Sequence, residues 1–176
     1  AANKADGRNA ADGRDKAYIR KIDGRTGTVA WTKTFDASAE NAGGAYAPVH
    51  IGKNELNGTV IASLSAAALN DGTDGGLIIA LDKSTGEEKW RVEQADGIWS
   101  APVVIYDENG KGYILQCDRG GKLTLYSGID GQAMCSIDLG SRIESTPAVF
   151  NNTLVVGTRG VDGSGQGPKI VGIRIG

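Results

Sequence analysis

The lone histidine of the chain, His50, is the first residue whose type could support acid–base chemistry. A histidine base needs a nucleophile beside it and an acidic side chain that orients its ring. The sequence contains no Gly-x-Ser-x-Gly motif to supply such a nucleophile. His50 follows Pro48 and Val49 in a short apolar run. This context predicts a structural or surface role, and we expect no catalytic residue in the chain.

Two cysteines, Cys117 and Cys135, could form a disulfide. Cys117 ends the second apolar run of a repeat unit that is described below, and Cys135 lies in the fourth run of the same unit. Two strand spacings separate such positions by ~9.6 Å, whereas a disulfide needs Cα atoms within about 7 Å. The sequence therefore predicts two free thiols, which leave the cellular compartment open.

Acidic and glycine-rich segments raise two further possibilities, a calcium site and a phosphate cradle. Ala-Asp-Gly-Arg occurs at 5–8 and 11–14, and Asp71 and Asp74 lie in a similar stretch. Calcium prefers clustered oxygen ligands, but Asp-Gly is common turn chemistry and no stretch has the full ligand set of a calcium loop. The segment 163–167 does not lead from a strand into a helix, as a phosphate cradle does. We expect turns here, a hairpin loop at 163–167 and no metal site.

A repeated segment determines how all these residues are positioned. Its copies contain Thr-Gly and then Trp four residues after the glycine: Thr26, Gly27 and Trp31 in the first, Thr85, Gly86 and Trp90 in the second. A weaker third copy has Gly131 and carries Cys135 at the tryptophan position. Self-similarity at a fixed period indicates a repeat architecture.

Proline gives the repeat a second, independent anchor. It recurs in Tyr-Ala-Pro-Val, Ser-Ala-Pro-Val and Ser-Thr-Pro-Ala, at Pro48, Pro102 and Pro147. The second and third prolines are 45 residues apart, as are Gly86 and Gly131. The first unit is longer, and its extra residues fall in two small, polar segments, 36–45 and 66–75, which predicts loops there.

Within the clearest unit, four short apolar runs alternate with clusters of Asn, Asp and Gly. The runs cover residues 101–106, 112–117, 122–126 and 133–137, and their β-branched and aromatic residues predict a strand meander. Four strands in about 45 residues make one β-propeller blade. We therefore expect an all-β fold, a β-propeller of four-stranded antiparallel blades with about three to four blades present. The best helical candidate is the short, alanine-rich segment 63–69.

The spacing of the repeat also predicts where each blade begins and ends. We expect a polar loop or disordered terminus at 1–15, a partial blade at 16–35, blades at 45–93 and 99–138, and a partial blade at 145–176. These units hold two, four, four and three strands, an odd inventory for a closed ring. The sequence therefore predicts a partial propeller. It is a fragment of a longer propeller or, as the alternative, an arc that a second copy of the chain completes.

Charge and hydropathy exclude two classes of partner. The net charge of −2 gives no electrostatic basis for binding nucleic acid. No apolar stretch approaches the ~20 residues of a membrane helix, so we expect no membrane span. Three charged residues, Arg142, Glu144 and Arg159, fall near first and second strands, and the pattern leaves open whether they face the propeller channel.

The segment from Leu77 to Trp90, followed by Ser-Ala-Pro-Val-Val at 100–104, resembles the repeat of quinoprotein-like β-propellers. That superfamily includes pyrroloquinoline quinone (PQQ) dehydrogenases and BamB-like envelope proteins, and the resemblance extends from Lys16 to the end. In the family the indole is inserted between neighbouring blades. The resemblance thus implies that Trp31 and Trp90 are structural clasps, and that the protein is periplasmic, on the cell surface or secreted.

Two functions are compatible with this resemblance. The first is a non-catalytic scaffold or binding module for a protein or polysaccharide partner, touched at the predicted loops and at Tyr46 and Trp99, for which core packing is the alternative role. The second is a fragment of a PQQ-dependent alcohol or sugar dehydrogenase, whose family signatures are bridged neighbouring cysteines, an aromatic floor and an aspartate base. Because the chain has no Cys-Cys pair, we favour the binding module and expect no cofactor.

Overall fold

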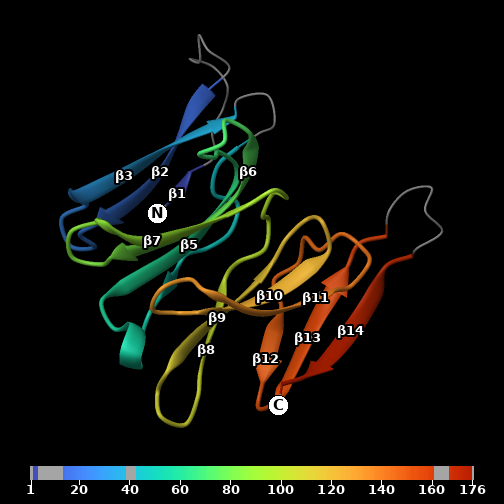
Figure 1. Cartoon of the computed structure of the whole chain (residues 1–176). Coiled ribbons are helices and arrows are strands. Elements are labelled where there is room, and N and C mark those ends of the chain that lie inside the picture. Colours follow the sequence, from blue (N-terminus) through green and yellow to red (C-terminus); the bar gives the residue numbers. More distant parts are fainter. Residues whose placement is uncertain (1, 4–13, 39–42, 161–166, 176) are drawn as a thin grey trace.

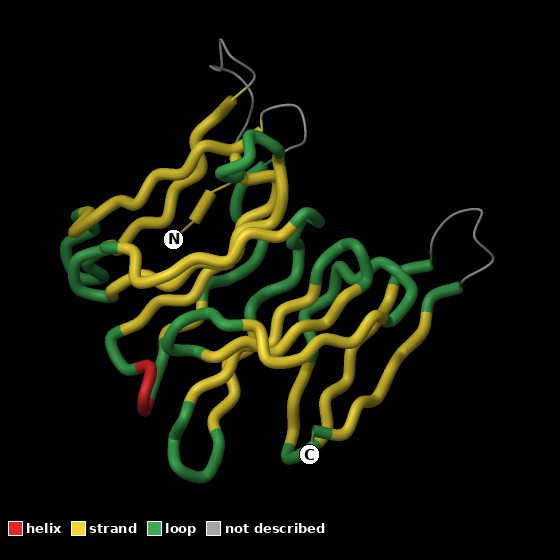
Figure 2. Tube along the Cα trace, in the orientation of Figure 1, coloured by secondary structure: helices red, strands yellow, loops and turns green. Residues whose placement is uncertain are grey.

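The computed structural model describes residues 2–3, 14–38, 43–160 and 167–175, and this part of the protein is built from β-strands (Figures 1 and 2). It contains no α-helix, only one 3₁₀ turn at Asn54–Leu56. The strands are β1 (Ala2–Asn3), β2 (Arg14–Ile22), β3 (Val29–Ser38), β4 (His50–Ile51), β5 (Thr59–Ala68), β6 (Asp74–Asp82), β7 (Glu88–Gln94), β8 (Val103–Tyr106), β9 (Gly112–Cys117), β10 (Lys122–Ser127), β11 (Ala133–Asp138), β12 (Ala148–Phe150), β13 (Thr153–Thr158) and β14 (Lys169–Arg174). No helix of the described residues could span a bilayer.

The strands form three antiparallel sheets that follow one another across Figure 1. The first sheet has the order β1-β2-β3-β5-β6-β7, with β4 paired to β5. The second has the order β11-β10-β9-β8 and the third β12-β13-β14. Strands that are neighbours in the chain pair with each other, as in propeller blades. The predicted all-β partial propeller of four-stranded antiparallel blades is confirmed.

The first partial blade and the blade that follows it are joined into one sheet. Ala37 of β3 pairs with Ala67 of β5, and Gly44 forms an isolated bridge with Ser65. The prediction of loops at 36–45 and 66–75 is therefore wrong at their ends, because β3, β5 and β6 extend into both segments. The paired residues Ala37 and Ala67 are small and buried. The backbones approach closely here: a Cβ added to Gly43 would lie 2.7 Å from the Ala66 carbonyl oxygen. Residues 39–42 lie outside the described part.

The alanine-rich segment 63–69 is extended, so its prediction as a helical candidate is wrong. Ser63 and Leu64 pair with residues of β6, and a bulge follows at Ser65 and Ala66, where Ala66 has a φ of 47°. Nearly every residue of β5 is buried. A strand buried on both faces shows no alternation of polar and apolar residues, so short alanine runs do not distinguish it from a helix.

Strand pairing reaches into the segment 1–15, for which the sequence predicts a polar loop or a disordered terminus. Ala2–Asn3 pairs with Tyr18 and Ile19, and β2 already begins at Arg14. The prediction is wrong for these residues because ladder hydrogen bonds come from the backbone and need no apolar side chain. Residues 1 and 4–13 lie outside the described part, with most of the Ala-Asp-Gly-Arg copies. So do 161–166, most of the predicted hairpin loop.

The turns of the repeat are closed by equivalent backbone hydrogen bonds. Gly27 N donates to Asp23 O at 2.8 Å, Gly86 N donates to Asp82 O at 2.9 Å, and Gly131 N donates to Ser127 O at 3.0 Å. The three glycines have φ values of 73°, 78° and 73°, which residues with a Cβ rarely adopt. This geometry accounts for the glycine in every copy of the motif.

Three buried apolar clusters fill the spaces between successive blades. The first contains Ile19 of β2 and Ile79 of β6, and the second contains Ile78 of β6 and Ile114 of β9. The third lies between the sheet β8–β11 and the sheet β12–β14. Ile78 and Ile79 are adjacent, yet each is at most 1% exposed. The middle blade is thus buried on both faces, and it holds its neighbours in fixed positions.

Candidate functional site

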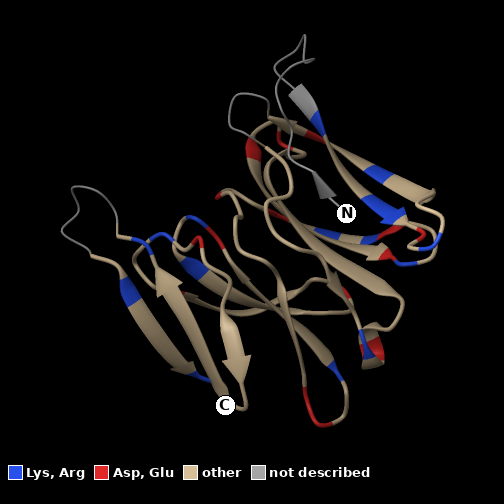
Figure 3. Cartoon of the chain, turned by 180° about the vertical axis from the view of Figure 1, so that it is seen from behind, with Lys and Arg blue, Asp and Glu red and all other residues tan. Residues whose placement is uncertain are grey.

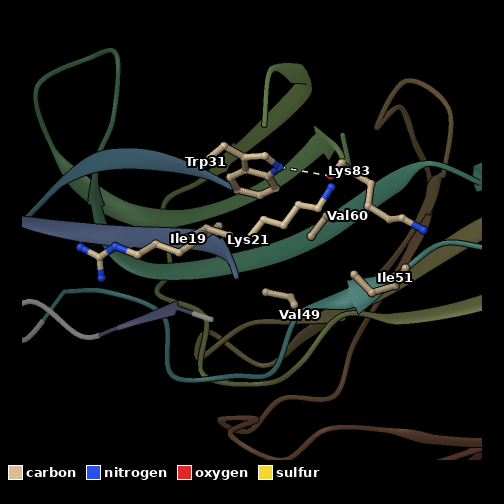
Figure 4. Close-up of a pocket in the computed structure, with 8 residues that line it drawn as sticks. Ile19, Lys21, Trp31, Val49, Ile51, Val60 and Lys83 are labelled. Carbon is tan, nitrogen blue, oxygen red and sulfur yellow. Dashed lines mark hydrogen bonds between the residues drawn. The ribbon is translucent and has the colours of Figure 1, made fainter. Parts of the chain in front are cut away.

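The two tryptophans of the repeat lie between blades. The Trp31 indole donates its N–H to the Lys83 carbonyl at 3.1 Å (Figure 4). The Trp90 indole donates in the same way to Gly128 O at 3.1 Å. A Cβ added to Gly86 would lie 2.7 Å from the Trp31 ring, and one added to Gly131 would lie 2.7 Å from the Trp90 ring. Each indole therefore rests directly on the Thr-Gly or Asp-Gly turn of the next blade.

The third copy of the motif differs, because Cys135 stands where the indole would be. Both cysteines are free, as predicted, with Cys117 buried and Cys135 exposed. Burial, with a smaller effect from the Asp118 charge, raises the pKa of the Cys117 thiol to about 12. The two thiols therefore differ strongly in reactivity, since the thiolate is the reactive form.

One end of the blades carries a set of equivalent positions, which we call the rim. The same backbone bond recurs at each blade: Ser65 N to Gly44 O at 2.8 Å, Arg119 N to Gly97 O at 2.9 Å, and Arg159 N to Arg142 O at 2.7 Å. Two residues after each acceptor lie Tyr46, Trp99 and Glu144. The three side chains therefore occupy one repeat position in three successive blades.

The rim side chains contact one another across the blades. The Tyr46 and Trp99 rings lie 5.4 Å apart between centroids, tilted by 31°. The Arg119 guanidinium lies 4.1 Å from the Trp99 ring centroid, within cation–π range. The same guanidinium is 3.3 Å from Glu144. Arg119 thus links the rim residues of two blades.

Glu144 organises the arginines of the rim. Its carboxylate is 3.1 Å from Arg159 and 3.8 Å from Arg142, in addition to the contact with Arg119. Glu144 is 19% exposed, whereas Arg142 and Arg159 are 41% and 59% exposed. Three guanidinium groups therefore surround one carboxylate, so this cluster by itself carries a surplus of positive charge. Figure 3 shows blue and red segments together on the loops at this end of β8–β14.

Serine side chains fix the backbone beneath the rim. Ser100 Oγ donates to Cys117 O at 2.7 Å, and Ser145 Oγ makes the equivalent bond to Gly157 O at 2.8 Å. The repeat prolines follow two residues later, and Pro102 and Pro147 are buried where they start the first strands. Proline restricts φ, so it directs the chain from the rim into the blade. Rigid backbone thus holds each rim side chain.

The structure brings Tyr46 and Trp99 together, along with the charged residues at 142, 144 and 159. Sequence reasoning missed Arg119, the residue that joins the aromatic pair to the ion pairs. Its signal in the sequence is its register: it lies two residues after Cys117, just as Arg159 lies two residues after Gly157 at the end of the equivalent strand.

The other candidates lie outside the rim. His50 is half-buried on β4, where burial and then the Lys53 charge lower its pKa. Asp71 accepts hydrogen bonds from Thr73 N and Oγ, as a turn residue does. Burial raises the pKa of Asp118, and the Asp96 charge raises it further. These groups offer no nucleophile–base pair.

A quinone with its metal ion can be tested against these residues. Within the described part of the chain, no three His, Cys, Asp or Glu side chains lie close enough together to hold a metal ion. Trp99 could serve as an aromatic floor, but the Arg119 guanidinium already lies over its ring. The donor set on these blades does not fit the cofactor, and we derive no oxidation step from it.

Solved structures share this architecture. BamB from Moraxella catarrhalis superposes with a TM-score of 0.53 and 17% identity, over 99% of this chain and 50% of that one. The quinohemoprotein alcohol dehydrogenase from Comamonas testosteroni gives a TM-score of 0.63 and 13% identity, over 87% of this chain and 35% of that one. The chain thus spans half or less of these proteins, and such low identity shows the fold alone.

Sequence comparison identifies the family. A search of curated proteins found no significant match. Residues 17–114, however, match the family model described as the glucose/ethanol/alcohol dehydrogenase β-propeller domain with PQQ repeats. This match covers more than half of the chain and includes Trp31, Trp90 and their glycines. The protein belongs to the PQQ-repeat β-propeller family.

Proposed function

We propose that the protein is a non-catalytic binding module whose rim docks an acidic segment of a protein partner. The observation that carries this proposal is the stack of Tyr46, Trp99 and Arg119 beside the Glu144 ion pairs. Tyrosine, tryptophan and arginine are the residues that dominate binding energy at protein interfaces. Their convergence from separate blades on one exposed end supports recognition more than packing.

Charge and order both favour an acidic partner. Arg142 and Arg159 are held by Glu144 and yet remain 41% and 59% exposed, so their free N–H groups can reach a second carboxylate. Arginine binds carboxylates through two parallel hydrogen bonds. Side chains that are already ordered lose less conformational entropy when a ligand binds. The rim is therefore prepared for carboxylates before a partner arrives.

Two further parts of the proposal, the cellular location and the association with other blades, rest on membership of the propeller family. We place the protein in the periplasm, on the cell surface or outside the cell, which fractionation of tagged cells can check. We also propose that the blades described here associate with further propeller blades or with a second copy. Light scattering during gel filtration tests the second copy, because a monomer of 18.2 kDa would contradict self-association.

The dehydrogenase remains the competing function, because the family model carries that description. It predicts that added PQQ and calcium produce dye-linked oxidation of an alcohol or a sugar. Our proposal predicts no such activity for this chain. If oxidation appears with the cofactor and disappears without it, the binding-module proposal is wrong and the protein is a dehydrogenase.

The binding test uses a fluorescent glutamate-rich peptide and measures anisotropy at low and physiological salt. We expect Trp99→Ala and Arg159→Ala each to weaken binding about tenfold, which corresponds to ~1.4 kcal/mol. The matched control is Arg91→Ala, which removes an arginine that is ion-paired to Glu88 on β7 and is not one of the rim residues. Equal loss in the control would mean that binding is non-specific, and the proposal would fail.

Two further probes separate the partner classes. A lysine-rich peptide of the same length should not bind, because it meets surplus positive charge on the rim. Polygalacturonate carries carboxylates on a polysaccharide. If it binds through Trp99 and the glutamate-rich peptide does not, the partner is a polysaccharide and not a protein.

A further inference from the structure

The space between the third and fourth blades lacks the indole that each of the two earlier spaces contains. Trp31 and Trp90 stand opposite Lys21 and Ala80 in their strand pairs, and Cys135 stands opposite Leu125 in the same way. All three residues lie four positions after the glycine of their turn. The third space therefore has a small thiol where the others have an indole.

The hydrogen-bond acceptor for an indole is nevertheless in place. Trp31 donates to the carbonyl of Lys83 and Trp90 to that of Gly128. Each of these residues directly follows the third strand of its blade and donates its own N–H back to the start of the second strand, Lys83 N to Gly58 O and Gly128 N to Gly112 O. Ile175 does the same, since its N–H donates to Asn152 O at 2.8 Å. Ile175 O is thus the third copy of the acceptor.

A cavity of about 220 Å³ lies at this position. Its walls come from both blades and are mainly apolar: Leu123, Leu125, Cys135 and Ile137 on one side, Leu154 and Ile173 on the other. An apolar cavity of about 150 Å³ is large enough to bind benzene. This cavity is larger, so a bicyclic aromatic ring is of suitable size. Neither the rim residues nor the serines beneath the rim line it.

We propose that the space beside Cys135 binds a small planar aromatic compound with an N–H donor, of the indole class, in the place of the missing tryptophan. The two earlier spaces indicate the occupant, because each holds an indole against the same elements of the fold. The apolar walls favour removal of the ring from water. The Ile175 carbonyl gives the N–H a partner, which a buried donor requires.

The thiol of Cys135 allows ligand binding to be measured by chemical labelling. Cys135 is exposed, whereas Cys117 is buried and its raised pKa keeps it protonated. A maleimide should therefore label Cys135 alone, and intact mass should show a single addition. A ligand beside Cys135 should protect it. By mass action, indole at ten times its dissociation constant should slow labelling roughly tenfold.

Matched ligands and variants distinguish this site from general hydrophobic binding. Benzofuran has the shape of indole without the N–H, and it should protect Cys135 at least several-fold less well. In Cys135→Trp the protein supplies its own indole, so the thermal midpoint should rise and the shift of that midpoint by added indole should vanish. Cys135→Leu, a milder filling change, should show the same loss if the tryptophan variant fails to fold.

Three results would overturn the proposal. The first is a labelling rate that does not change up to the solubility limit of indole. The second is equal protection by indole and benzofuran, which would remove the N–H from the argument. The third is a dimer in which Cys135 is already protected without ligand, because a second copy of the chain would then cover the space.

Discussion

The contact between Trp90 and Gly131 can be measured as a difference between two glycine substitutions. Gly27 and Gly131 both have a φ of 73°. A Cβ at Gly27 meets no atom within 4 Å, whereas a Cβ at Gly131 lies 2.7 Å from the Trp90 ring and 3.0 Å from Val92. Gly27→Ala thus reports backbone strain alone. Gly131→Ala reports the same strain together with the displaced indole.

The magnitudes follow from these contacts. A left-handed conformation costs a residue with a Cβ roughly 1–2 kcal/mol, so Gly27→Ala should lose about that free energy of unfolding. Overpacking adds about 1–3 kcal/mol, which brings Gly131→Ala to about 2–5 kcal/mol. Urea unfolding followed by far-ultraviolet circular dichroism measures both. The denaturant slope checks that the two variants unfold in the same transition.

A double-mutant cycle gives the sharper test. In a Trp90→Ala background the ring is absent, so the cost of Gly131→Ala should fall to that of Gly27→Ala. The interaction free energy should lie within about 0.5–3 kcal/mol. If Gly131→Ala costs no more than Gly27→Ala with Trp90 present, the indole does not rest on the turn and the inter-blade contact is wrong.

Three other substitutions test local contacts. The hydrogen bond from the Ser84 side chain, together with backbone N–H donors, lowers the pKa of Asp82 to about 2. The ionised Asp82 carboxylate therefore stabilises the fold above pH 4, and this stabilisation is lost as the pH falls toward 2. Asp82→Asn should remove that part of the acid dependence in pH-dependent thermal melts. Burial raises the pKa of Asp118, so ionisation of this carboxyl costs stability as the pH rises. Asp118→Asn should therefore stabilise the protein more at pH 7 than at pH 3 in the same melts. A difference in melting temperature between variant and parent that is the same at both pH values would contradict this. Ser100 is fully buried and bonds Cys117 O, so Ser100→Ala should lower the free energy of unfolding by about 1–3 kcal/mol in urea, whereas a neutral result would show that the bond adds nothing.

The repeat made the architecture predictable from the sequence. Thr85, Gly86 and Trp90 recur with one spacing because the turn needs a positive φ and the next blade needs room for the indole, and these local requirements leave the same residue types in each copy. In the third blade the expected runs 112–117 and 133–137 match β9 and β11 within one residue. Short alternating runs between turn residues suffice for such a blade.

The remaining features depend on contacts between distant segments. The pairing of Ala37 with Ala67 joins small residues 30 positions apart, and nothing local in either segment distinguishes a closely packed strand from a loop. Arg119 looked like an ordinary turn residue because its partners, Trp99 and Glu144, lie on different blades. Its role follows only when the blades are placed side by side.

The recurring backbone bonds beneath the rim, such as Arg119 N to Gly97 O, hold each rim position without help from the side chain that it presents. Tyr46, Trp99 and Glu144 show that ring and carboxylate are accepted alike at this one position. The contacts that join the blades, namely the buried apolar clusters and the indole on its glycine, do not involve the rim side chains. Recognition can therefore diverge blade by blade at little cost to folding, so that one scaffold can acquire a new specificity through a few exchanges at the rim.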